Sequence, residues 1–299
     1  MMYQKILVPL DGSPASESAL PLAASIARQS GATLQLVHVH TLNDSIYVED
    51  LPVIDDQLHS LRREHERVYL ERLCARVKAD GNLPVTCTAL DWDRSVANVL
   101  IAYIAATGID LVVMTTHGQS GWERMWLGSV ADSLIRWSPT PILLVRPTAA
   151  AHELLNRSDV CHMLVPLDGS ETAEQIIPHA LALGAVLKAE YLLLRVITSA
   201  VYHTPDLIRH VESDAQAYLA DIARRFHTLG ATATTHVVIA EQPARAILDV
   251  AAQKNPCVIA IATHGHSGMQ KLLLGSVADK LIRAAWLPIL VCHPHVDEP

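Results

Sequence analysis

Short apolar runs alternate with longer amphipathic stretches along the whole chain. In the first half the runs predicted to be strands are Lys5–Pro9, Thr33–His40, Val85–Leu90, Asp110–Thr115 and Ile142–Val145. The stretches predicted to be helices run from Ser13 to about Ser30, from Leu58 to Val77, over Ser95–Ala106, and from Ser129 to about Trp137. Continuous Val/Ile/Leu runs are typical of strands covered on both faces. The alternation therefore predicts an α/β fold, with parallel strands, right-handed crossovers and helices on both faces.

Residues at the ends of these runs support the helix assignments. Ser13 and Pro14 supply an N-cap and a first helical residue, and Gly31 ends that helix. One apolar face of the long helix is formed by Leu58, Leu61, Val68, Leu73 and Val77. Thr41–Asp56 has no clear period and contains Asn, Asp and Pro, so we predict a loop there.

The second half repeats the first. Ile6–Ser13 and Met163–Ser170 agree at seven of eight positions, and Thr116–Arg136 and Thr263–Arg283 agree at 14 of 21. The second set of predicted strands lies near 161–166, 190–196, 233–239, 257–262 and 288–292. A repeat of this length indicates two complete domains, which we place at 1–147 and 159–299 with a linker at 148–158.

The last strand of each domain is predicted to lie at the edge of its sheet. Ile142–Val145 and Ile289–Cys292 are both apolar, and exposed apolar edges invite pairing with another strand. We predict that these two strands pair antiparallel, so that the chain forms an internal pseudo-dimer. The sequence leaves open whether two chains then form a homodimer.

Composition narrows the class of partner. The net charge of −8, without a Lys/Arg-rich block, argues against nucleic acid held by neutralised phosphates. No run of 18 apolar residues offers a membrane span, and the amino terminus lacks a signal-peptide pattern, so we expect a cytoplasmic protein without a membrane partner. The five cysteines form no C-x-x-C pair and are predicted to be small apolar residues in a reducing compartment; they are Cys74, Cys87, Cys161, Cys257 and Cys292.

Two repeated motifs follow predicted strands. Asp11-Gly12-Ser13 follows the first strand of the first domain, and Thr116-His117-Gly118 follows the fourth. Ligands of an open α/β sheet bind beyond the carboxyl ends of the strands, where the strand order reverses. If the first and fourth strands are neighbours, these motifs face each other across a crevice.

The glycine-rich loop after the fourth strand favours an anion. Gly118 and Gly121 let backbone approach a ligand, while Gly128 and Ser129 open a helix whose first N–H groups suit phosphate. The second copy of this set is Gly265, Gly268, Gly275 and Ser276. The alternative interpretation is that Ser129 only N-caps the helix, with Asp132 completing a capping box, as Ser276 and Asp279 would in the copy.

Two further residue pairs have two interpretations each. Asp11 and Asp168 would accept hydrogen bonds from a base or ribose, or they would hold an Asx-type turn. His117 and His264 would donate to phosphate, or they would be structural groups.

Together the strand followed by D-G-S, the Gly-x-x-Gly loop and the nine-residue step to Gly-Ser-Val resemble the universal stress protein family. The resemblance implies two tandem flavodoxin-like (adenine nucleotide alpha hydrolase-like) domains, each a five-stranded parallel sheet of order 3-2-1-4-5. It also implies ATP or AMP, with or without Mg²⁺, between the first and fourth strands. Carried over to the first domain, the contacting residues are Pro9, Asp11, Val39, Gly118, Gly128, Ser129 and Val130. In the second domain they are Pro166, Asp168, Val196, Gly265, Gly275, Ser276 and Val277.

One position departs from the family's nucleotide-binding pattern. Its first glycine falls at Thr115 in the first domain and at Ala262 in the second. A Cβ there narrows the space beside the ribose and phosphates, so binding would be weakened, limited to AMP, or lost in a degenerate pocket. Because alanine intrudes less than threonine, we expect the second crevice to bind better.

Other chemistries find little support in the sequence. There is no P-loop, no G-x-G-x-x-G after a first strand, and no nucleophile–base set in the repeated motifs. The closest histidine pairs, His264/His266 and His293/His295, lack Cys or acidic partners at ligand spacing, so we expect no metal site. The sequence therefore favours a stress-response sensor or adaptor with at most slow ATP hydrolysis. The alternatives are a slow hydrolase with an irregular site, for example in Thr41–Asp56, and a structural stress protein that binds no nucleotide.

Overall fold

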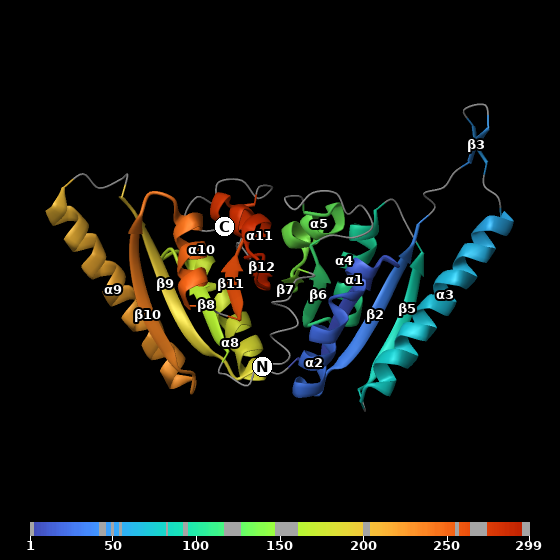
Figure 1. The fold of residues 1–299 in the computed structure, drawn as a ribbon, viewed down its shortest axis with the longest axis horizontal. Helices are drawn as coiled ribbons and strands as arrows, with labels where there is room; N and C mark the ends of the chain where they lie inside the picture. Colours follow the sequence, from blue (N-terminus) through green and yellow to red (C-terminus); the bar gives the residue numbers. More distant parts are fainter. Residues whose placement is uncertain are drawn as a thin grey trace.

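The computed structural model describes residues 3–41, 46–48, 51–53, 56–81, 83–91, 95–116, 127–146, 161–199, 204–254, 257–263 and 274–294. A single twisted sheet crosses the whole molecule, and helices cover both of its faces (Figure 1). The strands of the first half are β1 Lys5–Leu10, β2 Thr33–His40, β5 Val85–Asp91, β6 Leu111–Thr115 and β7 Ile142–Val145. Those of the second half are β8 His162–Pro166, β9 Glu190–Thr198, β10 Ala233–Ala240, β11 Val258–Ala262 and β12 Ile289–Cys292.

The helices fall between these strands as the sequence pattern predicts. In the first half they are α1 Pro14–Glu17, α2 Leu20–Ser30, α3 Asp56–Ala79, α4 Val96–Thr107 and α5 Ser129–Trp137. In the second half they are α7 Glu171–Glu174, α8 Ile176–Leu187, α9 Pro205–Thr228, α10 Pro243–Lys254 and α11 Ser276–Ala284. The first predicted helix is divided in two. Its start is as expected, because the Ser13 side chain accepts from Ser16 N, and Gly31 ends α2 in the left-handed region.

The strand order confirms the predicted fold class, with one difference in detail. The ten strands lie in the order β10-β9-β8-β11-β12-β7-β6-β1-β2-β5, so the strands of each half follow 3-2-1-4-5. Instead of forming two separate sheets, the halves are continuous through β7 and β12. These two strands pair antiparallel, with Leu143 opposite Leu290, whereas the other neighbouring strands of this sheet pair in parallel. The predicted antiparallel pairing of the two edge strands is therefore confirmed.

Two apolar layers run along the sheet, one on each face. Buried side chains of α2, α3, α8 and α9 pack on one face, and those of α4, α5, α10 and α11 pack on the other. Each layer includes residues from both halves, since alternate residues of β7 and β12 point to opposite faces. The halves are thus joined by packing as well as by strand pairing.

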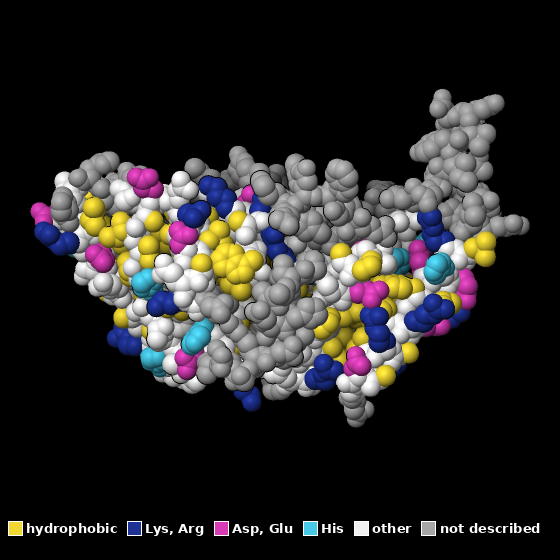
Figure 2. Space-filling view, in the orientation of Figure 1, with side chains coloured by type: hydrophobic (Ala, Val, Ile, Leu, Met, Phe, Trp, Pro, Cys, Tyr) yellow, Lys and Arg dark blue, Asp and Glu magenta, His cyan; other side chains and the backbone are white. Residues whose placement is uncertain are grey.

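The surface is mixed in charge. On the face shown in Figure 2, basic and acidic side chains are interspersed with apolar ones. Many of the ion pairs join residues three or four apart on one helix, as Arg209 and Asp206 do on α9. In the described part of the chain, no helix combines the length and apolar character that crossing a bilayer requires.

Two expectations in the first half were wrong. Thr41–Asp56, predicted as a loop, contains two short antiparallel strands, β3 Ile46–Val48 and β4 Leu51–Val53, which project beyond the end of the sheet (Figure 1). The turn-forming residues around these three-residue strands hid them in the sequence. Leu61, assigned to the apolar face of α3, is 67% exposed. It lies off the stripe that buries Leu73 and Val77.

The pairing of β7 with β12 can be tested by a double-mutant cycle. Leu143 and Leu290 are directly opposite and fully buried, so we expect each change to Ala to cost about 2–5 kcal/mol of unfolding free energy. Because the side chains share one contact, the double variant should deviate from additivity by roughly 0.5–3 kcal/mol in denaturant titrations. Leu61→Ala is the matched control and should change stability by no more than about 0.5 kcal/mol. Strict additivity of the two buried changes would contradict the pairing.

Candidate functional site

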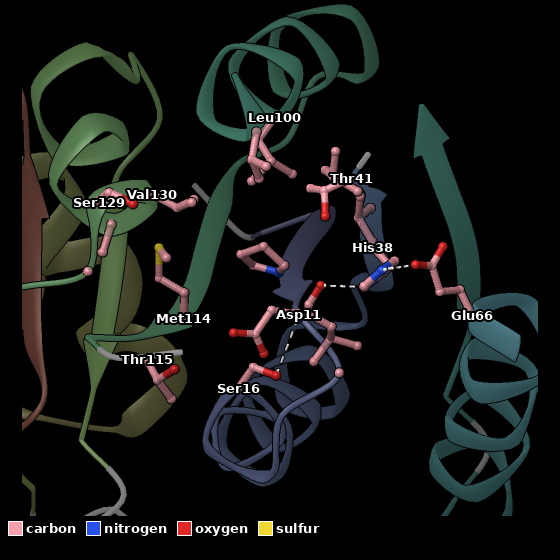
Figure 3. A pocket seen from close by; sticks show the side chains of 18 of the residues that line it. Asp11, Ser16, His38, Thr41, Glu66, Leu100, Met114, Thr115, Ser129 and Val130 are labelled. Atoms are coloured by element: carbon pink, nitrogen blue, oxygen red, sulfur yellow. Dashed lines mark hydrogen bonds and ion pairs between the residues drawn. The ribbon is translucent and has the colours of Figure 1, made fainter. Parts of the chain in front are cut away.

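A cavity of about 720 Å³ opens at the carboxyl ends of β1, β2 and β6 (Figure 3). Seven residues that the sequence assigned to a binding site line it together: Pro9, Asp11, Val39, Thr115, Gly128, Ser129 and Val130. In Figure 3, Asp11 lies in the middle of the cavity, with Ser129 and Val130 on one side and Glu66 on the other. The described first-half members of the predicted set thus converge on one space.

This cavity exists where two neighbouring strands part. β1 and β6 are paired only at Ile6 with Leu111 and at Leu7 with Val112. Beyond that point the chain leaves β1 for α1 and α2 on one face, whereas β6 is followed by α5 on the other. The strand order reverses here, so the two departing segments leave a space between them.

The turn after β1 is held by the Asp11 carboxylate. Its Oδ1 atom accepts hydrogen bonds from Ser13 N at 3.0 Å and from Ser13 Oγ at 2.6 Å. Gly12 has a φ of 82°, in the left-handed region that favours glycine. In the second half Asp168 Oδ1 accepts from Ser170 N at 3.0 Å and from Ser170 Oγ at 2.5 Å. The Asx-type interpretation therefore describes both turns, while a ligand role for either carboxylate stays a prediction.

The start of α5 differs from the predicted cap. Gly128, in an extended conformation, is the N-cap, and no side-chain hydrogen bond caps the helix. The interpretation of Ser129 and Asp132 as a capping box is therefore wrong. Ser129 is the first helical residue, and Asp132 forms two hydrogen bonds with Arg136 at 2.8 and 2.9 Å. The second half repeats this arrangement: Gly275 is the N-cap of α11, and Asp279 accepts from Arg283 at 2.8 Å.

An uncapped helix start leaves backbone donors at the cavity. Gly128 N donates to Thr116 O at 2.9 Å, and the first bond within the helix runs from Asp132 N to Gly128 O at 2.8 Å. The N–H groups of Ser129, Val130 and Ala131 consequently have no acceptor within the helix. All three residues line the cavity, so the positive end of the helix dipole meets it.

The opposite wall comes from α3 and was missed in the sequence. It contributes Arg62, His65, Glu66 and Tyr69, and Glu66 faces His38 on β2. Glu66 joins two strand histidines: its Oε2 lies 2.7 Å from His40 Nδ1, and its Oε1 lies 3.4 Å from His38 Nε2. The available signal was the pair His38 and His40 within a run otherwise predicted to be buried.

Tyr69 of this wall is held by a set of Tyr, Glu and Arg side chains that both halves contain, which we call the clamp. Its hydroxyl donates to Glu17 Oε1 at 3.2 Å, and Arg76 Nη2 lies 2.6 Å from Glu17 Oε2. Burial raises the pKa of Tyr69, and the Glu17 carboxylate raises it further, so the hydroxyl stays a donor. In the second half Tyr218 and Arg225 contact Glu174 at 3.1 and 2.7 Å.

The region of the second half that corresponds to this cavity is built differently. Matching the two clamps and the strand registers places Arg195 where the first half has His38, and Ala215 where it has Glu66. The Arg195 guanidinium lies 5.9 Å from the centre of the Tyr218 ring, and its Nη1 lies 3.5 Å from Leu167 O. A Cβ atom added at Gly169 would lie only 2.8 Å from Arg195 Nη1. The guanidinium therefore packs closely against the turn that follows β8.

Several predicted residues of the second site occupy the corresponding positions around β8, β9, β11 and α11. These are Pro166, Asp168, Val196, Ala262, Gly275, Ser276 and Val277. Six others lie outside the described residues, so their roles stay predictions: His117, Gly118, Gly121, His264, Gly265 and Gly268. Within the described ranges, no group of three or more His, Cys, Asp or Glu side chains is placed to hold a metal ion.

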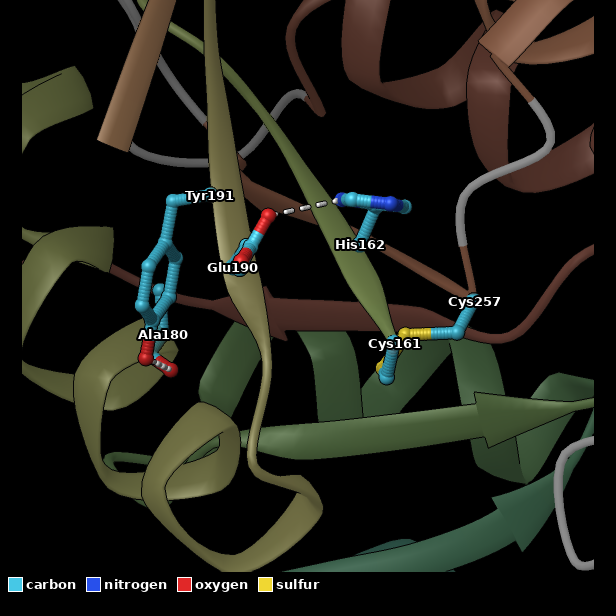
Figure 4. Close-up of a disulfide and its surroundings, with 6 residues drawn as sticks. All are labelled: Cys161, His162, Ala180, Glu190, Tyr191 and Cys257. Atoms are coloured by element: carbon cyan, nitrogen blue, oxygen red, sulfur yellow. Dashed lines mark hydrogen bonds and ion pairs between the residues drawn. A yellow bond between two sulfur atoms is a disulfide. The ribbon is translucent and has the colours of Figure 1, made fainter. Parts of the chain in front are cut away.

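One prediction about the cysteines was wrong. Cys161 and Cys257 form a disulfide, with their Cα atoms 5.5 Å apart (Figure 4). A separation of 96 residues in the sequence gave no sign of it. Cys74 and Cys292 are buried free thiols, as expected for small apolar residues, and Cys87 is partly buried.

Comparison with known proteins places this geometry in a family. The model of the Universal stress protein family matches residues 2–146 and again 161–293. A universal stress protein of Mycolicibacterium smegmatis is 26% identical over 300 residues, which cover 97% of each chain. Universal stress protein YxiE of Bacillus subtilis is 29% identical over 153 residues, covering 48% of this chain and all of the relative. The crystal structure of a universal stress protein from Archaeoglobus fulgidus shares the fold with a TM-score of 0.74 and 20% identity, covering 97% of this chain and 98% of that one.

The role of Asp11 in the turn predicts a contrast between two substitutions. Asp11→Ala removes the acceptor for Ser13 N and Ser13 Oγ, so we expect it to destabilise the protein by roughly 1–3 kcal/mol. Asp11→Asn keeps a side-chain carbonyl oxygen at the same place and should cost less than about 1 kcal/mol. Denaturant titration of both variants measures the difference. If the two substitutions had equal effects, the turn would not depend on this acceptor.

Proposed function

The chain belongs to the universal stress protein family, and we propose that its first half binds an adenine nucleotide, ATP or AMP, as a stress-response sensor or adaptor. The observation that carries this proposal is the uncapped amino end of α5 facing the Asp11 turn across one cavity. The volume of about 720 Å³ lies within the usual size of a small-molecule site.

The phosphates would bind at α5. Three successive N–H groups, from Ser129, Val130 and Ala131, lack helical acceptors and line the cavity. Such donors, together with the helix dipole, stabilise a phosphate without requiring a lysine. The glycine at position 128 lets the backbone start the helix without a side chain that would compete for these donors. The same arrangement at Gly275 supports a phosphate role for Ser276 and Val277.

The nucleoside would occupy the space toward β1 and β2. Val37, Val39 and Met114 offer an apolar surface for the base. The Asp11 carboxylate accepts hydrogen bonds and is suited to ribose hydroxyls. At the far wall, Glu66 would accept from the amino group of a base, which favours adenine over a base with a carbonyl group there.

Two features lead us to place the primary site in the first half, although Ala262 intrudes less than Thr115. The cavity is formed by first-half residues with Thr115 in its wall, so this side chain leaves room for a ligand. In the second half Arg195 crowds the turn beside Asp168. Because Arg195 occupies space beside the Asp168 turn, we propose that the second crevice binds an adenine nucleotide more weakly or more selectively than the first.

We propose binding without efficient catalysis. Among the described residues of the cavity, His38 contacts Leu10 O and Glu66, so it is not paired with a hydroxyl nucleophile. Hydrolysis of ATP, if it occurs, would be far slower than the 1–1,000 per second of ordinary enzymes, on the order of one per minute or below. Release of inorganic phosphate measures this directly.

The remaining proposals concern organisation. We propose residues 1–147 and 159–299 as the two domains, joined by residues 148–158. Pairing of β7 with β12 supports an internal pseudo-dimer, in which each half covers the apolar edge of the other. A cytoplasmic location stays a prediction from the sequence.

Removal of a single backbone donor tests the phosphate site. Proline is well tolerated at the first position of a helix, and Gly128 already has the extended conformation that suits a residue before proline. Ser129→Pro should therefore preserve the fold while deleting one N–H group from the cavity. We expect the affinity for AMP, measured by calorimetry, to fall about 10- to 100-fold, as loss of a charge-assisted hydrogen bond implies.

Two variants provide the controls for this experiment. Ser129→Ala keeps the N–H group and removes only the hydroxyl, so binding should change by less than about threefold. Ser276→Pro makes the same deletion in the second half and should leave binding in the first crevice unchanged. Equal AMP affinity of Ser129→Pro and the parent protein would refute the proposed phosphate site.

A further inference from the structure

The two halves tie the amino ends of equivalent strands by different chemistry. In the first half the Asp110 carboxylate, just before β6, accepts from Gln4 N at 2.6 Å and from Lys5 N at 2.9 Å. In the second half the corresponding positions are Cys257, just before β11, and Cys161, just before β8, and a disulfide joins them (Figure 4). The same two points are thus held noncovalently in one half and covalently in the other.

The backbone at this point is alike in both halves. Asp110 N donates to Lys5 O at 2.9 Å, and Cys257 N donates to His162 O at 2.7 Å. The first half therefore shows that this end of the sheet closes without a disulfide. The fold itself does not require the cysteine pair, and a role beyond closing the sheet becomes the better explanation for it.

The disulfide lies at the amino ends of β8 and β11, next to the short stretch over which these two strands pair. β8 and β11 are paired only at Met163 with Val258 and at Leu164 with Ile259. On their other edges, β8 pairs with β9 from His162 to Pro166, and β11 pairs with β12 from Ile259 to Ala262. Asp168 and Thr263 follow their carboxyl ends, seven and six residues beyond Cys161 and Cys257, or roughly 20–23 Å at about 3.3 Å per residue. The disulfide and the second crevice thus lie at opposite ends of the same two strands.

We propose that the Cys161–Cys257 pair is a redox-controlled tie that sets how far β8 and β11 can part, and so regulates the second crevice alone. The corresponding tie of the first half is the Asp110 carboxylate, which does not respond to thiol redox state. One chain therefore combines a redox-independent crevice with a redox-dependent one.

The chemistry is thiol–disulfide exchange with a small-molecule disulfide such as oxidised glutathione. One protein thiolate attacks the small disulfide and releases one small thiol, and the second protein thiolate then displaces the other. Two protein thiols lose two protons and two electrons, and the small disulfide becomes two thiols. Because Cys161 and Cys257 are 7% and 2% exposed, exchange takes place when the strand ends open transiently.

Cys292 competes poorly for this chemistry. Cys292, at the end of β12, is buried, and burial raises its pKa to about 12, so it remains a protonated thiol. The disulfide also closes a loop that spans 96 residues, which restricts the unfolded chain strongly. Its formation should thus slow opening throughout the strands that it joins.

Hydrogen exchange followed by mass spectrometry tests this without any ligand, so its outcome is independent of nucleotide binding. Denatured protein should present three alkylatable thiols in the oxidised form and all five in the reduced form. In the oxidised form, amides of β8, β11 and the Asp168 turn should exchange at least about tenfold more slowly. Amides of β1, β6 and the Asp11 turn should differ by less than about twofold between the two forms.

Variants separate the tie from a general effect of the reductant. Cys161→Ala/Cys257→Asp copies the carboxylate tie of the first half, so exchange in β8 and β11 should become independent of redox state. Cys292→Ser keeps the tie and should retain the full response. The proposal is overturned if exchange in β8 and β11 is equal in the two redox forms, if β1 and β6 respond to the same extent, or if oxidised glutathione leaves five free thiols.

Discussion

The structure depends on how two parallel strands separate after a short common register. β1 and β6 share two residue pairs, as do β8 and β11, and the chain then leaves the two strands of each pair toward helices on opposite faces of the sheet. This separation creates the cavity, places the Asp11 turn on one side of it and directs the start of α5 at the other. Since α5 begins at an uncapped glycine, its dipole and backbone donors act on whatever fills that space.

Local features of the fold could be predicted from sequence because they follow from local physical chemistry. The bounds of β2, α5 and β7 coincide with those expected from hydrophobic period and end signals. The repeat predicted two equivalent halves, and the apolar character of Ile142–Val145 predicted a covering partner, which β12 provides. For the site, the strand-end motifs identified the residues at the carboxyl ends of β1 and β6 and at the start of α5.

The rest was decided by contacts that a sequence pattern does not encode. Glu66 reaches the cavity only because α3 packs against β2 as well as β5, and Cys161 meets Cys257 across 96 residues. Whether Gly128 or Ser129 caps α5 depends on one residue's backbone conformation, and both residue types are suited to that position. The two crevices also differ through residues outside the repeated motifs, with Arg195 in one and His38 in the other. The two crevices thus share near-identical motifs but differ in the residues around those motifs.

The central claim is that the start of α5 holds the phosphate of an adenine nucleotide. A crystal structure of the full chain grown with AMP tests it most directly. The account predicts phosphate oxygens within hydrogen-bond distance, about 2.7–3.2 Å, of the N–H groups of Ser129 and Val130, with the base between β1 and β2. A first-half cavity that stays empty at millimolar AMP, or a nucleotide whose phosphate lies against Arg62 and His65 instead, would contradict it.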